Sequence, residues 1–310
     1  MTRYTATFVL AGLMSAGCGG GPPSAQSSLP FNPSLHEQSP TREQTIKRGF
    51  AVAEQGSNVV RIYPPHNRQN KPPVCTVPAS GVQDITSDAK GDLYVPNGDG
   101  TVVEYAPSCG APIQTWHEHQ GQPDDVTVFG KTVYVATLGT GEKAGDIAVC
   151  TSTCDGVLKD RVIALLFGIA VDAQGNVWAA VSSSGANAAL MVWRGGKMPG
   201  HIVTGNIDPD LTGLDFANDG TLLLVDEFRP GVYTYSCDAA AAKCRELGHW
   251  PLKYGGFFGK LDKANTQFQV ANNGTGEVDV YAYPGFAFQY SYNNGLNPND
   301  NVDGITAFPI

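Results

Sequence analysis

Charged residues are scarce in this chain of 310 residues, and basic residues are the scarcer kind. Lysine and arginine together number 20 against 29 aspartates and glutamates, so the formal net charge is −9 at pH 7. A chain of this charge repels the phosphate backbone of nucleic acids, which argues against a nucleic-acid partner. Beyond the N-terminus no apolar run approaches the roughly 18 to 20 residues that cross a bilayer, so we expect the body of the chain to be soluble.

Several catalytic signatures are missing as well. The chain contains no Gly-x-Ser-x-Gly elbow, no glycine-rich phosphate loop before a helix and no His-Glu-x-x-His motif. Interpretations as a serine hydrolase, a nucleotide-binding enzyme or a zinc protease therefore lack support. His117 and His119 would share one face of a strand, but two histidines are too few for a zinc site. We interpret them as a solvated pair.

The N-terminus is an export signal. Arg3 supplies a positive start, residues 5–14 (TATFVLAGLM) are apolar, and small residues precede Cys18. The segment LMSAGC resembles a bacterial lipoprotein signal, which implies that Cys18 is lipidated and becomes the new N-terminus. Residues 1–18 are thus predicted to be the signal, and residues 19–45, rich in Gly, Pro, Ser and Gln, a flexible tether.

Six cysteines remain after Cys18, an even number that suits an oxidising compartment. Six allow fifteen pairings, but spacing favours some of them. Cys150 with Cys154, and Cys237 with Cys244, each bracket a short polar segment, as hairpin-tip disulfides do, which leaves Cys75 to pair with Cys109. The alternative is zinc, which these spacings suit poorly because no histidine follows at ligand distance.

A phrase made of an apolar run, a polar glycine turn and a second apolar run recurs along the chain. It reads GIAVDAQGNVWAAV over residues 168–181 and DITSDAKGDLYVPN over residues 84–97. The first apolar positions of the copies are separated by 41, 43, 45, 43 and 48 residues, a period typical of propeller blades. These positions are Ile85, Val126, Ile169, Leu214, Phe257 and Ile305.

The sixth copy is split between the two ends of the chain. Residues 304–308 carry only the first half of the phrase and residues 50–54 only the second. Pairing of these strands would complete one blade and close the ring, which removes the uncovered ends of a radial stack. The prediction is an all-β, six-bladed β-propeller over residues 46–310, closed by its N- and C-terminal strands. Seven blades are the alternative.

The two quoted phrases resemble the NHL-repeat and gluconolactonase-like (TolB-like) class of six-bladed propellers, whose signature is roughly G-I-A-V-D-x-x-G-N-L-Y-V-A-D. The class includes lactonases, lyases and proteins that only bind partners, so the resemblance implies the architecture more firmly than an activity. In gluconolactonase-like enzymes a cation at one mouth of the central channel is held by Glu, Asn and Asp and polarises the lactone carbonyl.

The resemblance implies that the loops entering the innermost strands and leaving the second strands surround that mouth. The candidate ligands of a divalent cation there, Ca²⁺ above all, are Asp303, Asp124, Asp226, Glu54 and Asn97. The alternative is that Asp and Asn at these positions cap turns and bind backbone amides. The aromatic stretch at residues 281–292 is interpreted as an outer strand, with a sugar- or peptide-binding rim as the alternative.

The sequence therefore predicts an extracytoplasmic protein, lipid-anchored to the cell envelope and otherwise periplasmic or secreted. We expect a monomeric binding or interaction module for an envelope protein, peptide or glycan, with no catalysis and no required cofactor. The alternative function is a divalent-cation-dependent lactonase, another hydrolase or a lyase of the gluconolactonase-like class.

Overall fold

The computed structural model describes most of the chain from Gly49 to Phe308. The described residues are 49–107, 109–118, 121–138, 145–159, 163–183, 186–207, 211–226, 229–272 and 275–308. The predicted signal with Cys18, and the predicted tether, lie outside these residues. In the described part of the chain, no helix is long and apolar enough to span a membrane.

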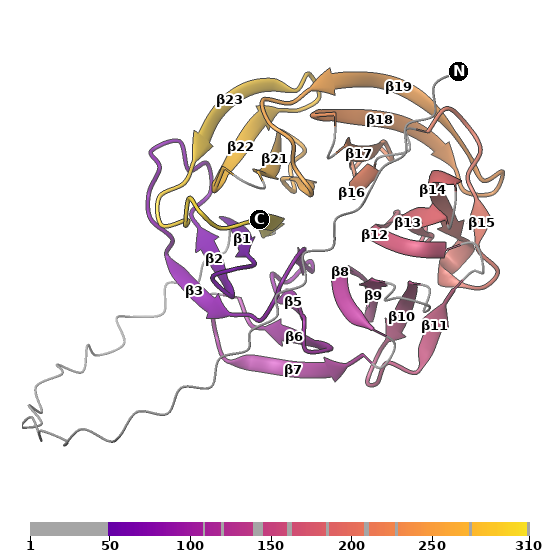
Figure 1. Cartoon of the computed structure of the whole chain (residues 1–310), viewed down its shortest axis with the longest axis horizontal. Coiled ribbons are helices and arrows are strands. Elements are labelled where there is room, and N and C mark those ends of the chain that lie inside the picture. The colour runs from indigo at the N-terminus through magenta and orange to yellow at the C-terminus, as the bar shows by residue number, and fades with distance from the viewer. Residues whose placement is uncertain are drawn as a thin grey trace, which may run out of the picture. The chain divides into compact units, whose positions relative to one another are not determined.

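Six four-stranded antiparallel sheets form the fold (Figure 1), and each sheet is one blade, whose strands run in order from the innermost outward. Blade 1 consists of β24 (Val302–Phe308), β1 (Gly49–Glu54), β2 (Val59–Tyr63) and β3 (Cys75–Pro78). Blade 2 consists of β4 (Thr86–Ser87), β5 (Leu93–Asn97), β6 (Thr101–Tyr105) and β7 (Pro112–His117). Blade 3 consists of β8 (Gln122–Phe129), β9 (Thr132–Leu138), β10 (Asp146–Cys150) and β11 (Gly156–Leu158).

The other three blades follow in chain order. Blade 4 consists of β12 (Ile163–Val171), β13 (Val177–Ser183), β14 (Ala186–Trp193) and β15 (His201–Ile202). Blade 5 consists of β16 (Leu211–Phe216), β17 (Leu222–Asp226), β18 (Gly231–Asp238) and β19 (Lys243–Pro251). Blade 6 consists of β20 (Gly259–Leu261), β21 (Gln267–Asn272), β22 (Glu277–Ala282) and β23 (Ala287–Tyr292). The helix content of the described residues is one 3₁₀ turn, η1 (Arg194–Gly196).

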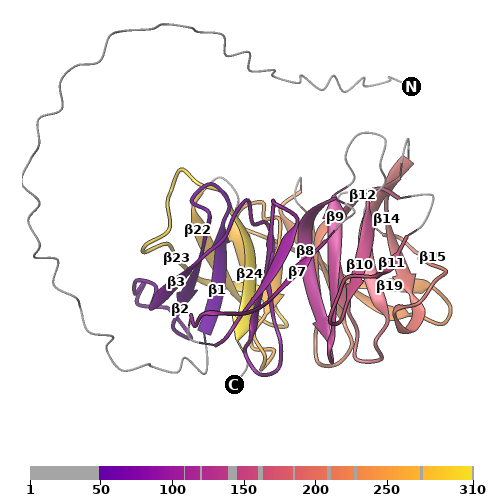
Figure 2. The same ribbon diagram turned by 90° about the horizontal axis from the view of Figure 1, so that it is seen from below.

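Blade 1 joins the two ends of the chain. Strand β24 pairs antiparallel with β1, with Val52 opposite Ile305 and Phe50 opposite Ala307. The two strands lie side by side in both views (Figures 1 and 2). This pairing confirms the predicted six-bladed closure, and the seven-bladed alternative is wrong. We call the face where β1 begins, at Gly49, the lower face, and the face where it ends, at Glu54, the upper face.

The repeated phrase is the hairpin of the two inner strands, and its aspartate caps the turn. Asp172 Oδ1 accepts hydrogen bonds from the backbone N–H groups of Gln174 at 3.0 Å and Asn176 at 2.9 Å. Asp88 and Asp262 cap the corresponding turns of blades 2 and 6. A short carboxylate that satisfies backbone donors two to five residues ahead explains why an aspartate recurs at this place.

The register of blade 6 differs from the predicted one by two residues. In the hairpin of blade 4, Ile169 lies opposite Ala179, and the turn aspartate follows three residues later. In blade 6 the residue three positions before the capping Asp262 is Gly259, which lies opposite Val270. Phe257, which the sequence aligned with Ile169, therefore precedes the strand. The last two intervals of the repeat become 45 and 46 residues, so the repeat is more regular than the sequence suggested.

The hydrophobic core lies between blades. Six buried clusters occur in the described residues, and each combines side chains of two neighbouring blades. Trp178 of blade 4, for example, packs with Leu214 and Tyr235 of blade 5. Tyr94, Tyr134 and Phe268, which also lie on second strands, occupy the equivalent wedges. Each sheet thus buries both faces against its neighbours, which only a closed ring achieves for every blade.

Three disulfides stabilise the propeller: the two pairs that the spacing favoured and the pair that they left over. Cys150–Cys154 closes the β10–β11 hairpin, and Cys237–Cys244 links opposed residues of β18 and β19. Cys75–Cys109 joins blade 1 to blade 2 across 34 residues of sequence. Loop-closure entropy assigns this longest loop about 4 kcal/mol. Three disulfides are typical of proteins that fold in an oxidising, extracytoplasmic environment.

Candidate functional site at the upper mouth of the channel

One residue from each innermost strand faces the central channel. These six residues, which we call the channel ring, immediately follow the buried position of the repeated hairpin and lie close to a polar cavity of about 80 Å³. The channel ring consists of Thr86, Thr127, Ala170, Asp215, Lys260 and Thr306. Because side chains alternate along a strand, the residue before the ring position, such as Ile85, Val126 or Ile169, packs between blades instead. The channel is therefore polar although the fold around it is apolar.

Lys260 crosses the channel from blade 6 to blade 2. Its Nζ lies 3.3 Å from Asp84 Oδ2 and donates a hydrogen bond of 3.0 Å to the backbone oxygen of Leu214 in blade 5. The lysine is 8% exposed and Asp84 is fully buried. Burial disfavours the charged ammonium, but nearby aspartates outweigh this effect and raise the pKa of Lys260 above its usual value. Lys260 is thus a permanent positive charge inside the ring.

Three aspartates around this ammonium connect adjacent blades. Each accepts a backbone N–H from the innermost strand of a neighbouring blade: Asp84 Oδ1 from Ile305 at 3.2 Å, Asp125 Oδ2 from Ile169 at 2.6 Å, and Asp215 Oδ2 from Leu261 at 2.7 Å. Burial raises the pKa of all three carboxyls, and the negative charge of Asp84 raises that of Asp125 further. The same aspartates thus lie near the Lys260 ammonium and link the innermost strands of neighbouring blades.

Asp124 and Asp303 lie beside this network at the upper mouth. They are 3% and 4% exposed, and Asp124 Oδ1 has no hydrogen-bond partner among the described residues. Burial raises the pKa of Asp124 well above its usual value, and the negative charges of Asp84 and Asp303 add to this rise. Two of the five predicted cation ligands are therefore near neighbours.

Glu54, Asp226 and Asn97, three of the predicted ligands, bind groups of the same chain. Glu54 forms an ion pair with Arg61, and its Oε1 accepts the backbone N–H of Asn297 at 2.6 Å. Asp226 accepts the backbone N–H of Arg229 at 2.8 Å, and its second oxygen lies 3.3 Å from the guanidinium Nε of that residue.

Asn97 has a turn role, in which its Oδ1 accepts the N–H of Ser80 at 2.8 Å and its Nδ2 donates to Thr101 Oγ1 at 3.2 Å. For this residue the turn-capping interpretation describes the contacts. Across the described ranges, no group of three or more His, Cys, Asp or Glu side chains is arranged to hold a metal ion. The five candidates are on one face, but three of them have their polar atoms engaged.

Two further sequence candidates lie away from the mouth. His117 is exposed at the end of the outermost strand of blade 2, and His119 is outside the described residues. In the aromatic stretch, Tyr281 and Tyr292 are 2% and 1% exposed and pack into inter-blade clusters of blade 6. Phe288 is the exception, at 48% exposed, with the Lys253 ammonium 5.3 Å from its ring centroid.

Lys260 is the functional-site residue that the sequence did not single out. Lysine beside a turn is ordinary in a β protein, and the two-residue register error in blade 6 hid the equivalence of Lys260 with Thr86 and Asp215. The signal that would have found it is a lysine at the channel-ring position, where the other blades have threonine, alanine or aspartate.

No protein-family model matches the chain, and no curated protein matches it. Solved structures do match, at low sequence identity. The chain is similar to a propeller in a crystal structure of a nidogen/laminin complex, with a TM-score of 0.66 and 15% identity over 84% of this chain and 98% of that one. A Bacteroides caccae protein of unknown function has a TM-score of 0.62 and 11% identity over 84% and 99% of the two chains.

A third match is a "putative 6-phosphogluconolactonase" from Bacteroides uniformis, with a TM-score of 0.56 and 12% identity over 82% of this chain and 85% of that one. Identities this low show a shared fold and no more. These neighbours of one fold include a member of a protein complex and a protein named for lactonase activity, so fold alone does not select a function.

Proposed function

We propose that this protein is a binding or interaction module of the cell envelope, with an envelope protein, a peptide or a glycan as its ligand. The supporting observation is that three carboxylates at the upper mouth already pair with cations of the same chain: Glu54 with Arg61, Asp226 with Arg229 and Asp84 with Lys260. A catalytic acid or metal ligand must direct its charge at a substrate or an ion. Carboxylates already paired inside the fold favour a rigid framework whose loops make the contacts.

The proposed anchor is the lipidated Cys18, followed by the tether of residues 19–45. A flexible chain of this length has a root-mean-square span of roughly 30 Å, by the square-root scaling of Gly- and Ser-rich linkers. Such a tether lets a membrane-held propeller sample partners near the membrane surface and raises their effective concentration. The three disulfides fit the oxidising side of the membrane that this proposal requires.

The nidogen/laminin match supports a binding role by analogy, because that propeller fold was solved in a complex with another protein. Partner binding by this chain is tested by placing a photo-crosslinking amino acid at Asp99, in the exposed β5–β6 turn of the upper face. We expect a discrete envelope-protein or glycan adduct in intact cells. The matched control is the same substitution at Asp219, in the exposed β16–β17 turn of the lower face. Equal adducts at both positions, or none at Asp99, would contradict an upper-face binding module.

The second candidate function is a Ca²⁺-dependent hydrolase or lyase, which Asp124 and Asp303 at the mouth favour. Ca²⁺ takes six to eight oxygen ligands and would polarise a substrate carbonyl. A cage of all five candidates would need Glu54 and Asp226 to share their oxygens with the ion, although both are paired with arginine. The fit is therefore incomplete, because Glu54, Asp226 and Asn97 already bind partners within the chain.

Calorimetric titration of the mature protein with Ca²⁺, alongside Asp124→Ala and Asp303→Ala, separates the two functions. The binding module predicts no stoichiometric Ca²⁺ uptake that depends on these residues. Stoichiometric uptake that both substitutions abolish, together with hydrolysis of lactones or esters, would replace the module with the enzyme. Release of Cys18→Ser from membrane fractions is the expected result for the anchor, and unchanged retention would contradict it.

A further inference from the structure

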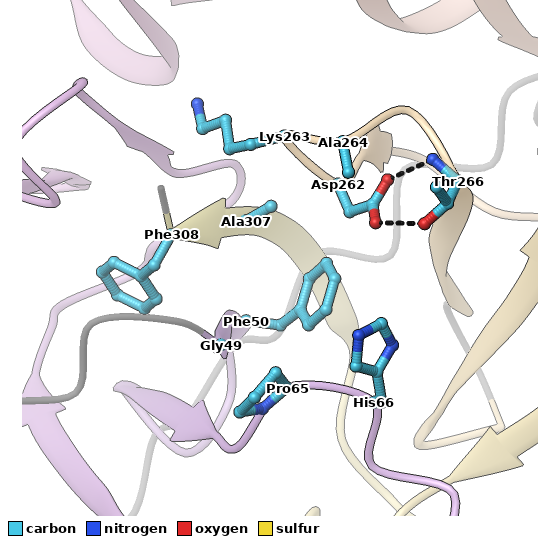
Figure 3. Close-up of a pocket in the computed structure, with 10 residues that line it drawn as sticks. All are labelled: Gly49, Phe50, Pro65, His66, Asp262, Lys263, Ala264, Thr266, Ala307 and Phe308. Atoms are coloured by element: carbon cyan, nitrogen blue, oxygen red, sulfur yellow. Dashed lines mark hydrogen bonds between the residues drawn. The ribbon is translucent and has the colours of Figure 1, made fainter. Parts of the chain in front are cut away.

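A cavity of about 270 Å³, larger than the channel cavity, lies at the opposite end of the channel, on the lower face (Figure 3). Blade 1 contributes the start of β1, the end of β24 and the loop after β2, and blade 6 contributes the β20–β21 turn. Lys263 and Ala307 line both this cavity and the smaller channel cavity, so the two adjoin. We infer that this lower pocket is a binding site for a small organic anion with an apolar or aromatic body.

The one carboxylate that lines the pocket has both oxygens engaged within its own turn. Asp262 Oδ1 accepts the backbone N–H groups of Thr266 at 2.6 Å and Gln267 at 3.0 Å, and its Oδ2 accepts the Thr266 hydroxyl at 2.6 Å. Figure 3 shows this carboxylate turned toward Thr266. The Lys263 ammonium and the His66 ring, in contrast, make no ion pair or side-chain hydrogen bond with any other described residue. The Lys263 ammonium is therefore the charged group left for a ligand, and an anion is the ligand charge that complements it.

The other wall of the pocket is apolar. Phe50 and Pro65 line it, and Phe50 is 4% exposed, whereas the ring of Phe308 packs into the cluster between blades 1 and 2. In Figure 3 the Phe50 ring lies beside His66, across from the Asp262–Thr266 turn. Small-molecule sites combine such apolar lining with a few polar groups that fix orientation, and pockets for drug-sized ligands have volumes of about 300 Å³ or more. A pocket just below that size suits a compact aryl or alkyl carboxylate or phosphate.

The backbone at His66 gives an independent reason to assign a role to this rim. His66 has a φ of 50°, in the left-handed region that a side chain with a Cβ rarely adopts. The loop is fastened to the strand connection after blade 6, where Asn70 Oδ1 accepts the N–H groups of Asn293 at 2.9 Å and Asn294 at 2.8 Å. Such conformations persist where the surroundings impose them, and they cluster at functional sites. The strain here holds an imidazole at the edge of the cavity.

This inference goes beyond the proposed envelope partner and does not depend on it. The test is calorimetric titration of the mature protein with benzoate and phenyl phosphate at low ionic strength, with neutral benzyl alcohol as the charge control. We expect saturable binding of the anions, weakened at least tenfold in Lys263→Met and in His66→Asn. Asparagine tolerates the left-handed backbone, so the second variant removes the imidazole without the strain of most other residues.

The matched control is Lys90→Met, an exposed lysine in the lower turn of blade 2 that does not line the pocket. It should leave anion binding unchanged, and circular dichroism should show that all variants are folded. Loss of binding in Lys90→Met equal to that in Lys263→Met would indicate general surface charge and overturn the assignment. No saturable anion binding, or equal affinity for benzyl alcohol, would overturn it as well.

Discussion

The two mouths of the channel differ in which side chains have polar partners within the chain. At the upper mouth, carboxylates are dense and buried, and most of them contact a cation or a backbone amide of the same chain, Asp124 Oδ1 being an exception. At the lower mouth the carboxylate is the satisfied group, while Lys263 and His66 line an open cavity with aromatic walls. The upper mouth has the composition expected of an active site, but its contacts are those of a structural network. No sequence motif marks the lower mouth, but its cavity, at about 270 Å³, is larger than the channel cavity of about 80 Å³.

Breaking the upper network should have the largest effect. Lys260→Met removes the ammonium and leaves Asp84 and its neighbours buried without their counter-charge, which typically costs about 3 to 5 kcal/mol. Urea unfolding at pH 7 measures this loss. The loss should shrink toward pH 4, because protonation of the carboxyls removes the uncompensated charge. The double variant Lys260→Met/Asp84→Asn should recover part of the stability, whereas a Lys260→Met variant as stable as wild type would show that the network is dispensable.

A smaller effect of opposite sign is expected at Asp124. The pKa of Asp124 is raised in the folded protein, so the unfolded chain ionises first as the pH increases. The stability contributed by the protonated carboxyl is complete below the unfolded pKa of about 3.9 and is lost as the pH rises through the folded pKa. Asp124→Asn should therefore be more stable than wild type at neutral pH, by on the order of 1 kcal/mol, and equal to it near the acid limit.

Unfolding of Asp124→Asn in chelator and in Ca²⁺ sharpens this prediction. In chelator, a variant less stable than wild type at pH 7 would mean that the Asp124 charge is favourable in the fold. If Ca²⁺ stabilised the wild type but not Asp124→Asn, Asp124 would be a metal ligand, and the enzyme function would be favoured.

The smallest effect is expected at the lower mouth. Lys263→Met and His66→Asn should each change the free energy of unfolding by no more than about 0.5 kcal/mol, because neither side chain has a polar partner to lose among the described residues. Paired with the anion titrations, this result would separate binding residues from framework residues. A loss comparable with that of Lys260→Met would show instead that the lower mouth is also part of the closure.

Local patterning predicted the hairpins, their number and the disulfide partners. The Val-Asp-x-x-Gly turn is such a case, because the Asp172 carboxylate binds amides within four residues of itself. Ring closure could also be predicted from the sequence, since the strands that contain Ile305 and Val52 are complementary halves of one repeat. The register of blade 6 was not, because Phe257 and Phe258 precede Gly259 and an apolar pair imitates the start of a strand. Hydrophobic pattern alone cannot tell such positions apart.

The ion-pair partners of the candidate ligands could not be predicted from the sequence, for a different reason. Glu54 and Arg61 are seven residues apart, on adjacent strands, and the sequence contains both without stating which partner either will take. Lys260 and Asp84 are separated by most of the chain and by one intervening blade. Whether an acidic residue at a channel mouth binds a cation or a neighbour's side chain depends on contacts across the ring.

By itself, the sequence determined an all-β chain of repeated hairpins, a split repeat that closes it, and cysteines positioned to bridge neighbouring strands. Those features follow from side-chain alternation, turn chemistry and loop length, which act within one blade or between consecutive blades. Only the tertiary structure decided that Lys260 would satisfy the buried aspartates of the channel, and that a cavity lined by Lys263 and His66 would form at the lower face. Both depend on six sheets meeting at one axis, where residues far apart in sequence share a small, poorly solvated volume and charge must be balanced.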